Sequence, residues 1–115
     1  MHELSIAMSI VDMAENEANR AGAQQVTHLD IDVGTLSGVV PESLDFALKQ
    51  AVLDSVLEKC SITIHRIQAK ARCNGCTETF EVMDYFDLCP RCENPDISII
   101  QGEELRLRSL KVITD

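Results

Sequence analysis

The sequence predicts an α/β fold in which two helices pack on a three-stranded sheet and a zinc-ribbon-like lobe is inserted before the last strand. Three observations lead to this prediction. Two segments carry apolar residues at helical spacing, other segments carry them in strand-like patterns, and four cysteines form two matched CxxC pairs. The elements therefore follow the order helix, strand, helix, strand, lobe, strand.

The first half of the chain predicts two helices separated by a strand. Residues 3–21 repeat apolar side chains every three to four positions, and Gly22 is typical of a helix end. Residues 26–33 alternate apolar and polar side chains, which indicates a strand with one buried and one solvated face. Pro41 suits the first turn of a second helix, which we expect to run to about residue 57.

Strands flank the cysteines on both sides. A strand that begins at Ile62 is expected to run directly into Cys73. After the cysteines, residues 97–100 form a short predicted strand and residues 105–113 a longer one, whose apolar phase shifts after Leu107 as it does at a β-bulge. We therefore expect the cysteine segment to be an insertion between two strands of the main sheet.

These patterns divide the chain into two units. Residues 1–68 and 101–115 form the predicted main α/β domain, and residues 69–100 form the inserted zinc-binding domain. The inserted segment has few large apolar side chains, so metal binding must supply much of its folding free energy.

The four paired cysteines, Cys73, Cys76, Cys89 and Cys92, have the spacing of a metal site. Each CxxC turn directs two sulfurs to one point, and two such turns facing each other form a tetrahedral cage. Because four thiolates close the coordination shell, we predict one structural Zn²⁺ with no catalytic role. Iron in a rubredoxin-like cage is an alternative. A redox dithiol is a weaker one, because a single CxxC pair would suffice for it.

The charge balance disfavours nucleic acid as a partner. The formal net charge is −9, with ten acids and three bases in residues 1–59 and nine acids and seven bases in residues 60–115. The chain lacks the basic stripe that nucleic-acid binding needs, and its field favours a cation or a basic protein surface. We expect no membrane span and no signal peptide, and paired thiols suit the reducing cytoplasm.

The first two residues offer a second kind of metal site. The α-amine of Met1, the backbone nitrogen of His2 and the His2 imidazole can close adjacent chelate rings around one ion. Planar nitrogen donors of this kind suit Ni²⁺ or Cu²⁺. On these residues alone, the alternative is a frayed terminus before a helix, as at most chain starts.

Several motifs together resemble one protein family. They are the opening Met-His-Glu-Leu-Ser, the strand-to-helix stretch of residues 33–46, the paired CxxC motifs with Cys-Pro-Arg-Cys at residues 89–92, and a closing strand that ends near Ile113. Over essentially its whole length, the chain resembles the HypA/HybF family of hydrogenase nickel-incorporation proteins.

The resemblance implies a nickel metallochaperone that delivers Ni²⁺ to a [NiFe]-hydrogenase large-subunit precursor and works with a GTPase accessory protein. It implies that His2 binds nickel together with the amine of Met1 and nearby backbone nitrogens, and that Glu3 supports this site. The main α/β domain is then the nickel-binding domain, and the zinc of the lobe is structural. The oligomeric state stays open, and a homodimer is among the states we consider.

Two classes of function therefore compete, a nickel chaperone and a zinc-ribbon adaptor that acts only through protein contacts. A chaperone of this kind requires a free N-terminal amine, whereas an adaptor does not. Neither a nucleophile with its base, nor a phosphate loop, nor a pair of catalytic carboxylates is evident, so we expect no enzyme.

The remaining potential ligands are interpreted as structural, with a metal role as the alternative for each. Cys60, the unpaired cysteine, is predicted to be a small thiol in the core. His28, Asp30 and Asp32 share one face of a strand, which we expect to be solvated. His65 is interpreted as a packed or edge histidine.

Overall fold

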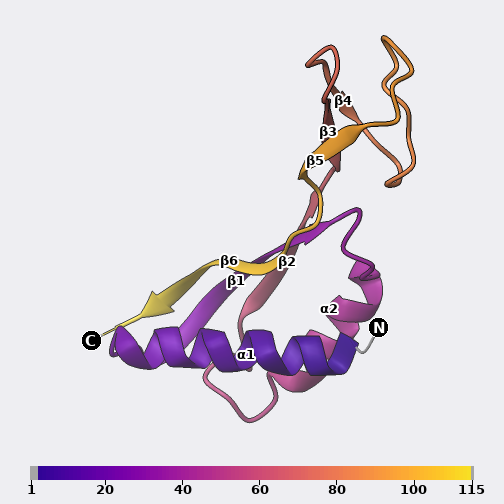
Figure 1. The fold of residues 1–115 in the computed structure, drawn as a ribbon. Helices are drawn as coiled ribbons and strands as arrows, with labels where there is room; N and C mark the ends of the chain where they lie inside the picture. The colour runs from indigo at the N-terminus through magenta and orange to yellow at the C-terminus, as the bar shows by residue number, and fades with distance from the viewer. Residues whose placement is uncertain (1–2, 115) are drawn as a thin grey trace.

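The computed structural model describes residues 3–114, and two helices and six strands are found there. These elements are α1 (Glu3–Arg20), β1 (Gln25–Gly34), α2 (Pro41–Ala51), β2 (Ser61–Ile67), β3 (Lys70–Cys73), β4 (Thr79–Glu81), β5 (Ile97–Gln101) and β6 (Leu105–Ile113). The two helices, β1, β2 and β6 make up a larger part that we call the body. The other three strands and their loops form the lobe, which projects from one end of the body (Figure 1).

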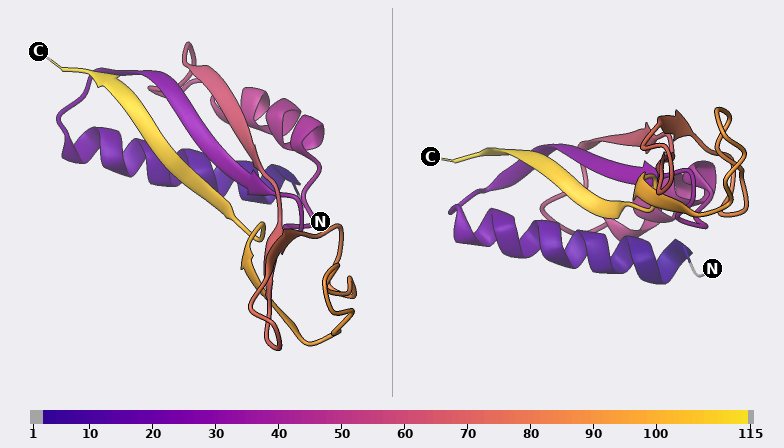
Figure 2. Two further views of the ribbon diagram at one scale, coloured as in Figure 1. Left: turned by 90° about the horizontal axis from the view of Figure 1, so that it is seen from above. Right: turned by 45° about the horizontal axis from the view of Figure 1, so that its top comes forward.

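The body sheet has the strand order β2-β1-β6. β1 is parallel to β2 and antiparallel to β6. Both helices lie on the same face of this sheet, as Figures 1 and 2 show. Alternate residues of β1 point toward the helices, and Leu29, Ile31 and Val33 are fully buried there. The predicted fold of two helices on a three-stranded sheet is confirmed, and within residues 3–114 no helix covers the other face of the sheet.

Small apolar residues let α1 approach the sheet and α2 closely. The helix buries Ala7, Ile10, Val11, Ala14 and Ala18, which recur at helical spacing. It ends as predicted, because Gly22 adopts φ +67° and the N–H of Ala23 returns to the carbonyl of Ala18 at 2.9 Å. Within residues 3–114, neither helix is long and apolar enough to cross a membrane.

The second helix is shorter than its apolar pattern predicts, since it ends at Ala51 and not near residue 57. Ser55 ends the helical repeat, because its hydroxyl donates to the Val52 carbonyl at 2.6 Å and accepts from the Leu57 N–H at 3.0 Å. The carbonyl of Val56 is then free to accept the N–H of Val26 at 3.1 Å. The apolar residues after Ala51 are buried by these turns and not by a helix.

The predicted strand from Ile62 to Cys73 is in fact two strands that belong to different sheets. β2 ends at Ile67 in the body, and β3 begins at Lys70 in the lobe, where the strand order is β4-β3-β5. The interruption arises at Ala69, whose N–H donates to the Thr35 side chain at 3.0 Å and leaves the body sheet. β4 is a further strand that the sequence patterns did not predict.

Two chain segments connect the body to the lobe, and the loop after β1 binds both of them. The N–H of Thr35 donates to the Ile67 carbonyl at 2.9 Å, and the N–H of Leu36 donates to the Gly102 carbonyl at 2.8 Å. Gly102 has φ +114°, and a Cβ there would lie 2.3 Å from the Cα of Ala69. Only glycine fits at this position. We call the crossing formed by Thr35, Leu36, Ile67, Ala69 and Gly102 the neck.

The bulge predicted in the last strand is confirmed. Asp30 of β1 lies opposite Ser109, whereas the next residue, Ile31, lies opposite Leu107. Arg108 is therefore the extra residue of β6, and the bulge restores the alternation of the strand's apolar residues toward the helices.

Candidate metal centre

The four paired cysteines come together at one side of the lobe. Cys73 ends β3 and Cys76 lies in the turn that follows it, while Cys89 and Cys92 belong to the loop between β4 and β5. All four sulfur atoms lie within 4.8 Å of one another. The Sγ atom of Cys73 is 3.6 Å from that of Cys92, and the Sγ atom of Cys76 is 3.6 Å from that of Cys89.

These separations fit a metal ion held in a tetrahedral cage. Metal–sulfur bonds of about 2.3 Å place the sulfurs of a tetrahedron about 3.8 Å apart. The observed 3.6 Å is close to this value, whereas a disulfide would require about 2.05 Å. All five cysteines of the chain are free. The chain therefore has a four-cysteine metal site with a complete set of sulfur ligands.

The two CxxC turns share one backbone conformation. In each, the N–H of the first cysteine donates to the carbonyl five residues later, and its carbonyl accepts from the N–H four residues later. These distances are 2.8 and 3.1 Å at Cys73, and 3.1 and 2.8 Å at Cys89. The residue after each second cysteine has positive φ, 66° at Thr77 and 62° at Glu93. Such a conformation costs a non-glycine residue roughly 1–2 kcal/mol, so metal binding must offset strain in both turns.

The electrostatics of the four thiols favour a bound cation. The N–H groups of Cys76 and Gly75 lie 3.4 and 3.3 Å from the Cys73 sulfur and lower the pKa of Cys73 to about 6. At Cys92, a hydrogen bond from the Asn94 backbone lowers the pKa, but the bond with Cys73 and burial outweigh it and raise the pKa to about 12. Once one thiol is ionised, its negative charge therefore disfavours ionisation of the neighbouring thiol. A bound cation removes this repulsion, because thiolates are the form that binds metal.

Polar side chains connect the two cysteine loops beside the metal site. Asn74 donates from its side chain to Asp96 at 2.9 Å, and its amide oxygen accepts from Ser98 at 3.0 Å. The backbone N–H of Asp96 in turn binds the side chain of Asn94 at 2.9 Å. Sequence reasoning missed these residues and the two positive-φ positions. The available signal was the presence of asparagine and aspartate next to the cysteines, since both favour tight turns.

The predicted nickel ligands are only partly within the described residues. Met1 and His2 lie outside them, so the structure does not place the predicted chelate. Glu3 is the first residue of α1 and is half-buried. A carboxylate in the first turn of a helix favourably faces the positive end of the helix dipole, which gives Glu3 a structural role whether or not metal binds.

The strand face predicted to be solvated contains one buried charge, which corrects the prediction for Asp32. The side chain of Asp32 is only 2% exposed. The Nε atom of Arg106 lies 3.0 Å from one of its oxygens, and the Nε atom of Arg108 lies 2.6 Å from the other. Arg106 pairs directly opposite Asp32 across the sheet, and the bulge adds Arg108 to the same face. Sequence periodicity could not show this, because the arginines come from a distant strand.

The other residues considered as ligands have structural partners. Nε2 of His65 lies 2.7 Å from a carboxylate oxygen of Asp30, and this hydrogen bond is the largest of the influences that lower the pKa of Asp30. Nδ1 of His28 instead lies 3.0 Å from the Thr27 hydroxyl. Cys60 packs against the core as predicted, and burial raises the pKa of its thiol. Among the described residues, the four paired cysteines form the one cluster that could hold a metal ion.

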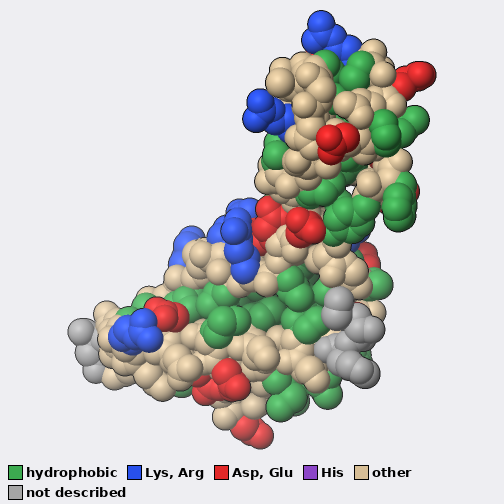
Figure 3. Space-filling view, viewed as in Figure 1, with side chains coloured by type: hydrophobic (Ala, Val, Ile, Leu, Met, Phe, Trp, Pro, Cys, Tyr) green, Lys and Arg blue, Asp and Glu red, His purple; other side chains and the backbone are tan. Residues whose placement is uncertain are grey.

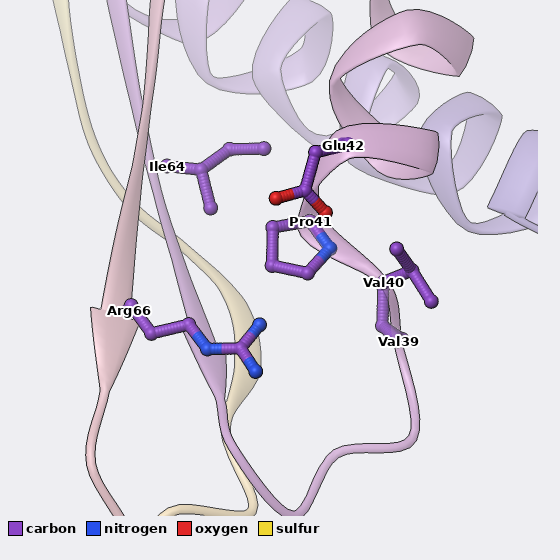
Figure 4. A pocket seen from close by; sticks show the side chains of 6 residues that line it. All are labelled: Val39, Val40, Pro41, Glu42, Ile64 and Arg66. Carbon is purple, nitrogen blue, oxygen red and sulfur yellow. The ribbon is translucent and has the colours of Figure 1, made fainter.

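A cavity of about 430 Å³ opens between the start of α2 and β2 (Figure 4). One acid, one base and four apolar residues line it: Val39, Val40, Pro41, Glu42, Ile64 and Arg66. The single carboxylate and the single guanidinium leave this lining without net charge. It contains neither cysteine nor histidine, so its chemistry does not compete with the cysteine cluster for a transition metal.

Comparison with known proteins places the chain in a family. A family model described as "Hydrogenase/urease nickel incorporation, metallochaperone, hypA" matches residues 1–112. The chain belongs to the HypA family. A hydrogenase maturation factor HypA of Parabacteroides distasonis is 41% identical over 112 residues, which cover 97% of each protein. The HypA of Geobacter metallireducens is 37% identical over 97% of this chain and 99% of its own length.

Two solved structures share the fold. The solution structure of the Ni metallochaperone HypA from Helicobacter pylori superimposes with a TM-score of 0.72 at 23% identity, with both chains covered completely. A second HypA solution structure gives a TM-score of 0.74 at 24% identity and covers 100% of this chain and 98% of that one. The family consists of nickel-incorporation metallochaperones in hydrogenase maturation, and the chain is accordingly not an enzyme.

Proposed function

We propose that this HypA-family protein binds Ni²⁺ at its N-terminus and delivers it to the large-subunit precursor of a [NiFe]-hydrogenase. The observation that carries this proposal is the match over residues 1–112 to a family described by nickel incorporation. The relatives named as hydrogenase maturation factors support the hydrogenase as the recipient. The precursor itself and the direct transfer to it are the parts that this proposal adds.

The cysteine cluster is proposed to hold one structural Zn²⁺. Four sulfur ligands complete a tetrahedral shell, and Zn²⁺ is the usual occupant of such a shell. A closed, partly buried site of this kind does not release its ion readily. Cargo nickel therefore needs a different and more accessible site, which separates the metal that maintains structure from the metal that is delivered.

The proposed nickel ligands are the amine of Met1, the backbone nitrogen and imidazole of His2, and neighbouring backbone nitrogens, with Glu3 supporting them. Amine, amide and imidazole nitrogens favour Ni²⁺ in a planar arrangement. Because the amine and the amide must lose protons on binding, nickel affinity should fall as the pH decreases from neutrality.

Partners, domain roles and a cellular location are also proposed. We propose a GTPase accessory protein and the hydrogenase precursor as partners, with neither nucleic acid nor membrane among them. We propose that residues 1–68 with 101–115 form the nickel-binding domain and that residues 69–100 form the zinc-binding domain. Free, paired thiols suit a reducing compartment, so we propose that the protein acts in the cytoplasm.

A single added residue in front of Met1 tests the proposed chelate. The addition converts the α-amine into an amide and changes the ring sizes, so specific nickel binding should be lost in a calorimetric titration. The zinc content should remain at one per chain, because the cysteines lie more than seventy residues away. His2→Ala is the matched variant and should lose nickel binding equally, with little change in thermal stability.

The same experiment separates the chaperone from a zinc-ribbon adaptor that carries no ion. Both hypotheses need the lobe, but only the chaperone needs the free amine. Each variant is therefore tested for restoring hydrogenase activity in cells that lack the protein. Full activity from the extended chain, despite the loss of its nickel binding, would favour the adaptor over the chaperone.

A further inference from the structure

The turn between the first two cysteines contains an asparagine followed by a glycine, Asn74 and Gly75. In such a pair the backbone nitrogen of the glycine attacks the side-chain carbon of the asparagine and expels ammonia, and water then opens the resulting succinimide ring to aspartate or isoaspartate. Glycine permits this attack because it has no Cβ that would obstruct it. The same turn has to keep its shape to bind metal, so its chemical stability bears directly on the metal site.

Asn74 is the one asparagine of the chain that is followed by glycine. Asn16 and Asn19 lie within α1 and precede large charged residues. Asn94 precedes Pro95, whose nitrogen carries no proton and cannot form the ring. These three asparagines therefore serve as internal references for the reactivity of Asn74.

Water reaches the Asn74–Gly75 pair in the folded protein. Both residues are exposed, and Figure 3 shows the lobe standing clear of the body. Burial therefore does not protect the asparagine, and its protection depends on how the reacting atoms are held.

Hydrogen bonds hold both reacting groups in the folded lobe. The side chain of Asn74 donates to a carboxylate oxygen of Asp96 at 2.9 Å, and its amide oxygen accepts from the Ser98 hydroxyl at 3.0 Å. The N–H of Gly75, which is the attacking group, donates to the Cys73 sulfur at 3.3 Å. Ring closure consumes the donor groups of the Asp96 and Cys73 contacts, so the folded turn opposes the reaction.

These contacts belong to the arrangement that the metal holds together. Asn74 lies between the cysteines of the first pair, whereas Asp96 and Ser98 follow the second pair. The apolar cluster of the lobe has three small buried members, so loss of the metal removes the main constraint that keeps the two segments together. A zinc-free chain therefore releases both Asn74 and Gly75 to react.

We propose that Asn74 is a deamidation site that bound zinc protects and that zinc loss exposes. The Gly75 nitrogen forms a bond to the side-chain carbon of Asn74, the bond from that carbon to the side-chain nitrogen breaks, and the Gly75 proton leaves with this nitrogen as ammonia. Water then opens the ring at either carbonyl carbon. The proposal rests on the proposed zinc in the cysteine cluster and is independent of nickel binding.

Both products interfere with metal binding. Isoaspartate adds the Cβ of residue 74 to the main chain and so lengthens the turn, which the N–H of Thr77 closes on the Cys73 carbonyl at 3.1 Å. Aspartate places a carboxylate against that of Asp96 and beside the thiolates, where like charges repel. Loss of supporting contacts around a metal site lowers its affinity roughly 10–100-fold. Deamidation therefore opposes the return of zinc to a chain that has lost it.

Peptide mapping by mass spectrometry measures the reaction. Zinc-loaded protein, with its zinc content determined beforehand, and protein stripped of zinc by a chelator are incubated side by side at neutral pH without oxygen, so that the thiols form no disulfides. The peptide that contains Asn74 should exchange NH₂ for OH at least about tenfold faster in the stripped protein, because local unfolding exposes the site. The peptides that contain Asn16, Asn19 and Asn94 should not change in either sample.

Asn74→Ser is the matched variant, because serine is also small and polar but has no amide group that can cyclise. After the incubation without zinc, the wild-type protein should rebind zinc at least about tenfold more weakly than before, whereas the variant should rebind it as before. The affinity of each protein before incubation is its own reference, so a weaker starting affinity of the variant does not affect the comparison.

Equal rates with and without zinc, or no reaction at Asn74 in either sample, overturn the proposal. So does a stripped wild-type protein that rebinds zinc with its original affinity after Asn74 has reacted, or an equal loss of affinity in the wild type and the variant. A starting protein without stoichiometric zinc would contradict the zinc assignment itself, and the proposal with it.

Discussion

The body buries fifteen apolar residues in one cluster, whereas the lobe buries Ala69, Ala71 and Val82. Leu36, which belongs to the body, packs against that small cluster, so part of the lobe's apolar contact is with the body. Burial of apolar surface contributes roughly 25 cal/mol per Å², and three small buried side chains, with Phe80, Ile97 and Ile99 partly buried against them, contribute too little to stabilise a separate three-stranded sheet. The lobe therefore depends on its metal and on the neck, whereas the body does not depend on the metal.

Loss of the metal site should have the largest effect and should separate the two regions. Cys89→Ser removes a buried ligand, and a structural zinc site contributes on the order of 10 kcal/mol to the folding of a small domain. We expect the amide resonances of β3, β4 and β5 to collapse to unfolded positions in a ¹⁵N-correlation spectrum, while those of α1 and β1 stay dispersed. Cys60→Ser, which alters the unpaired thiol, is the control and should keep the lobe folded.

A substitution at the neck should break the connection between the regions without touching the metal. Gly102→Ala combines a positive φ with a Cβ placed 2.3 Å from the Ala69 Cα, and we expect a loss of about 3 kcal/mol or more in unfolding free energy. Gly22→Ala is the control, because Gly22 also has positive φ but open space around it. It should cost only about 1 kcal/mol. Equal losses in chemical denaturation would show that backbone conformation, and not the crowded crossing, determines the effect at Gly102.

Replacement of the buried carboxylate of Asp32 measures how much the charge contacts on the helix-free face of the body sheet contribute to stability. Asp32→Asn removes the charge that Arg106 and Arg108 share, and we expect a loss of about 2 kcal/mol, below the range for fully buried pairs because both arginines are partly exposed. Asp45→Asn affects only the exposed pair with Lys49 and should change stability by less than about 0.5 kcal/mol. Urea denaturation of both variants at neutral pH measures the difference, and no lobe resonance should move in either.

The smallest expected effect is a pH dependence that belongs to the body alone. The pKa of Asp30 is lowered first by its hydrogen bond to His65. A lowered carboxylate pKa contributes stability that is present above the ordinary value of about 4 and lost as the pH falls through the lowered one. His65→Leu should remove this contribution, roughly a few tenths of a kcal/mol at neutral pH, and flatten the acid side of the stability profile. His28→Leu on the same strand face should leave the profile as it is.

Much of the architecture could be predicted from local patterns. Helical and alternating periodicities predicted α1, β1 and β6, and the phase shift in β6 correctly predicted a bulge. Gly22 predicted the end of α1. The cysteine spacing predicted that four sulfurs meet, because a CxxC turn determines the geometry of each pair whatever surrounds it.

Only the tertiary structure determined those features in which a contact with residues distant in sequence overrides the local pattern. The chain leaves α2 while its apolar pattern continues, because the Ser55 side chain binds the backbone of Val52 and Leu57 and the Val56 carbonyl accepts the N–H of Val26 in β1. The neck divides one continuous strand pattern between two sheets, since Thr35 hydrogen-bonds to Ile67 and Ala69 on either side of the break and Gly102 packs closely on Ala69. Asp32 is predicted to be a solvated strand residue, but two arginines of a strand more than seventy residues later cover it: Arg106 lies opposite it, and the bulge adds Arg108. Periodicity reports which face a residue occupies, and the fold alone determines what lies on that face.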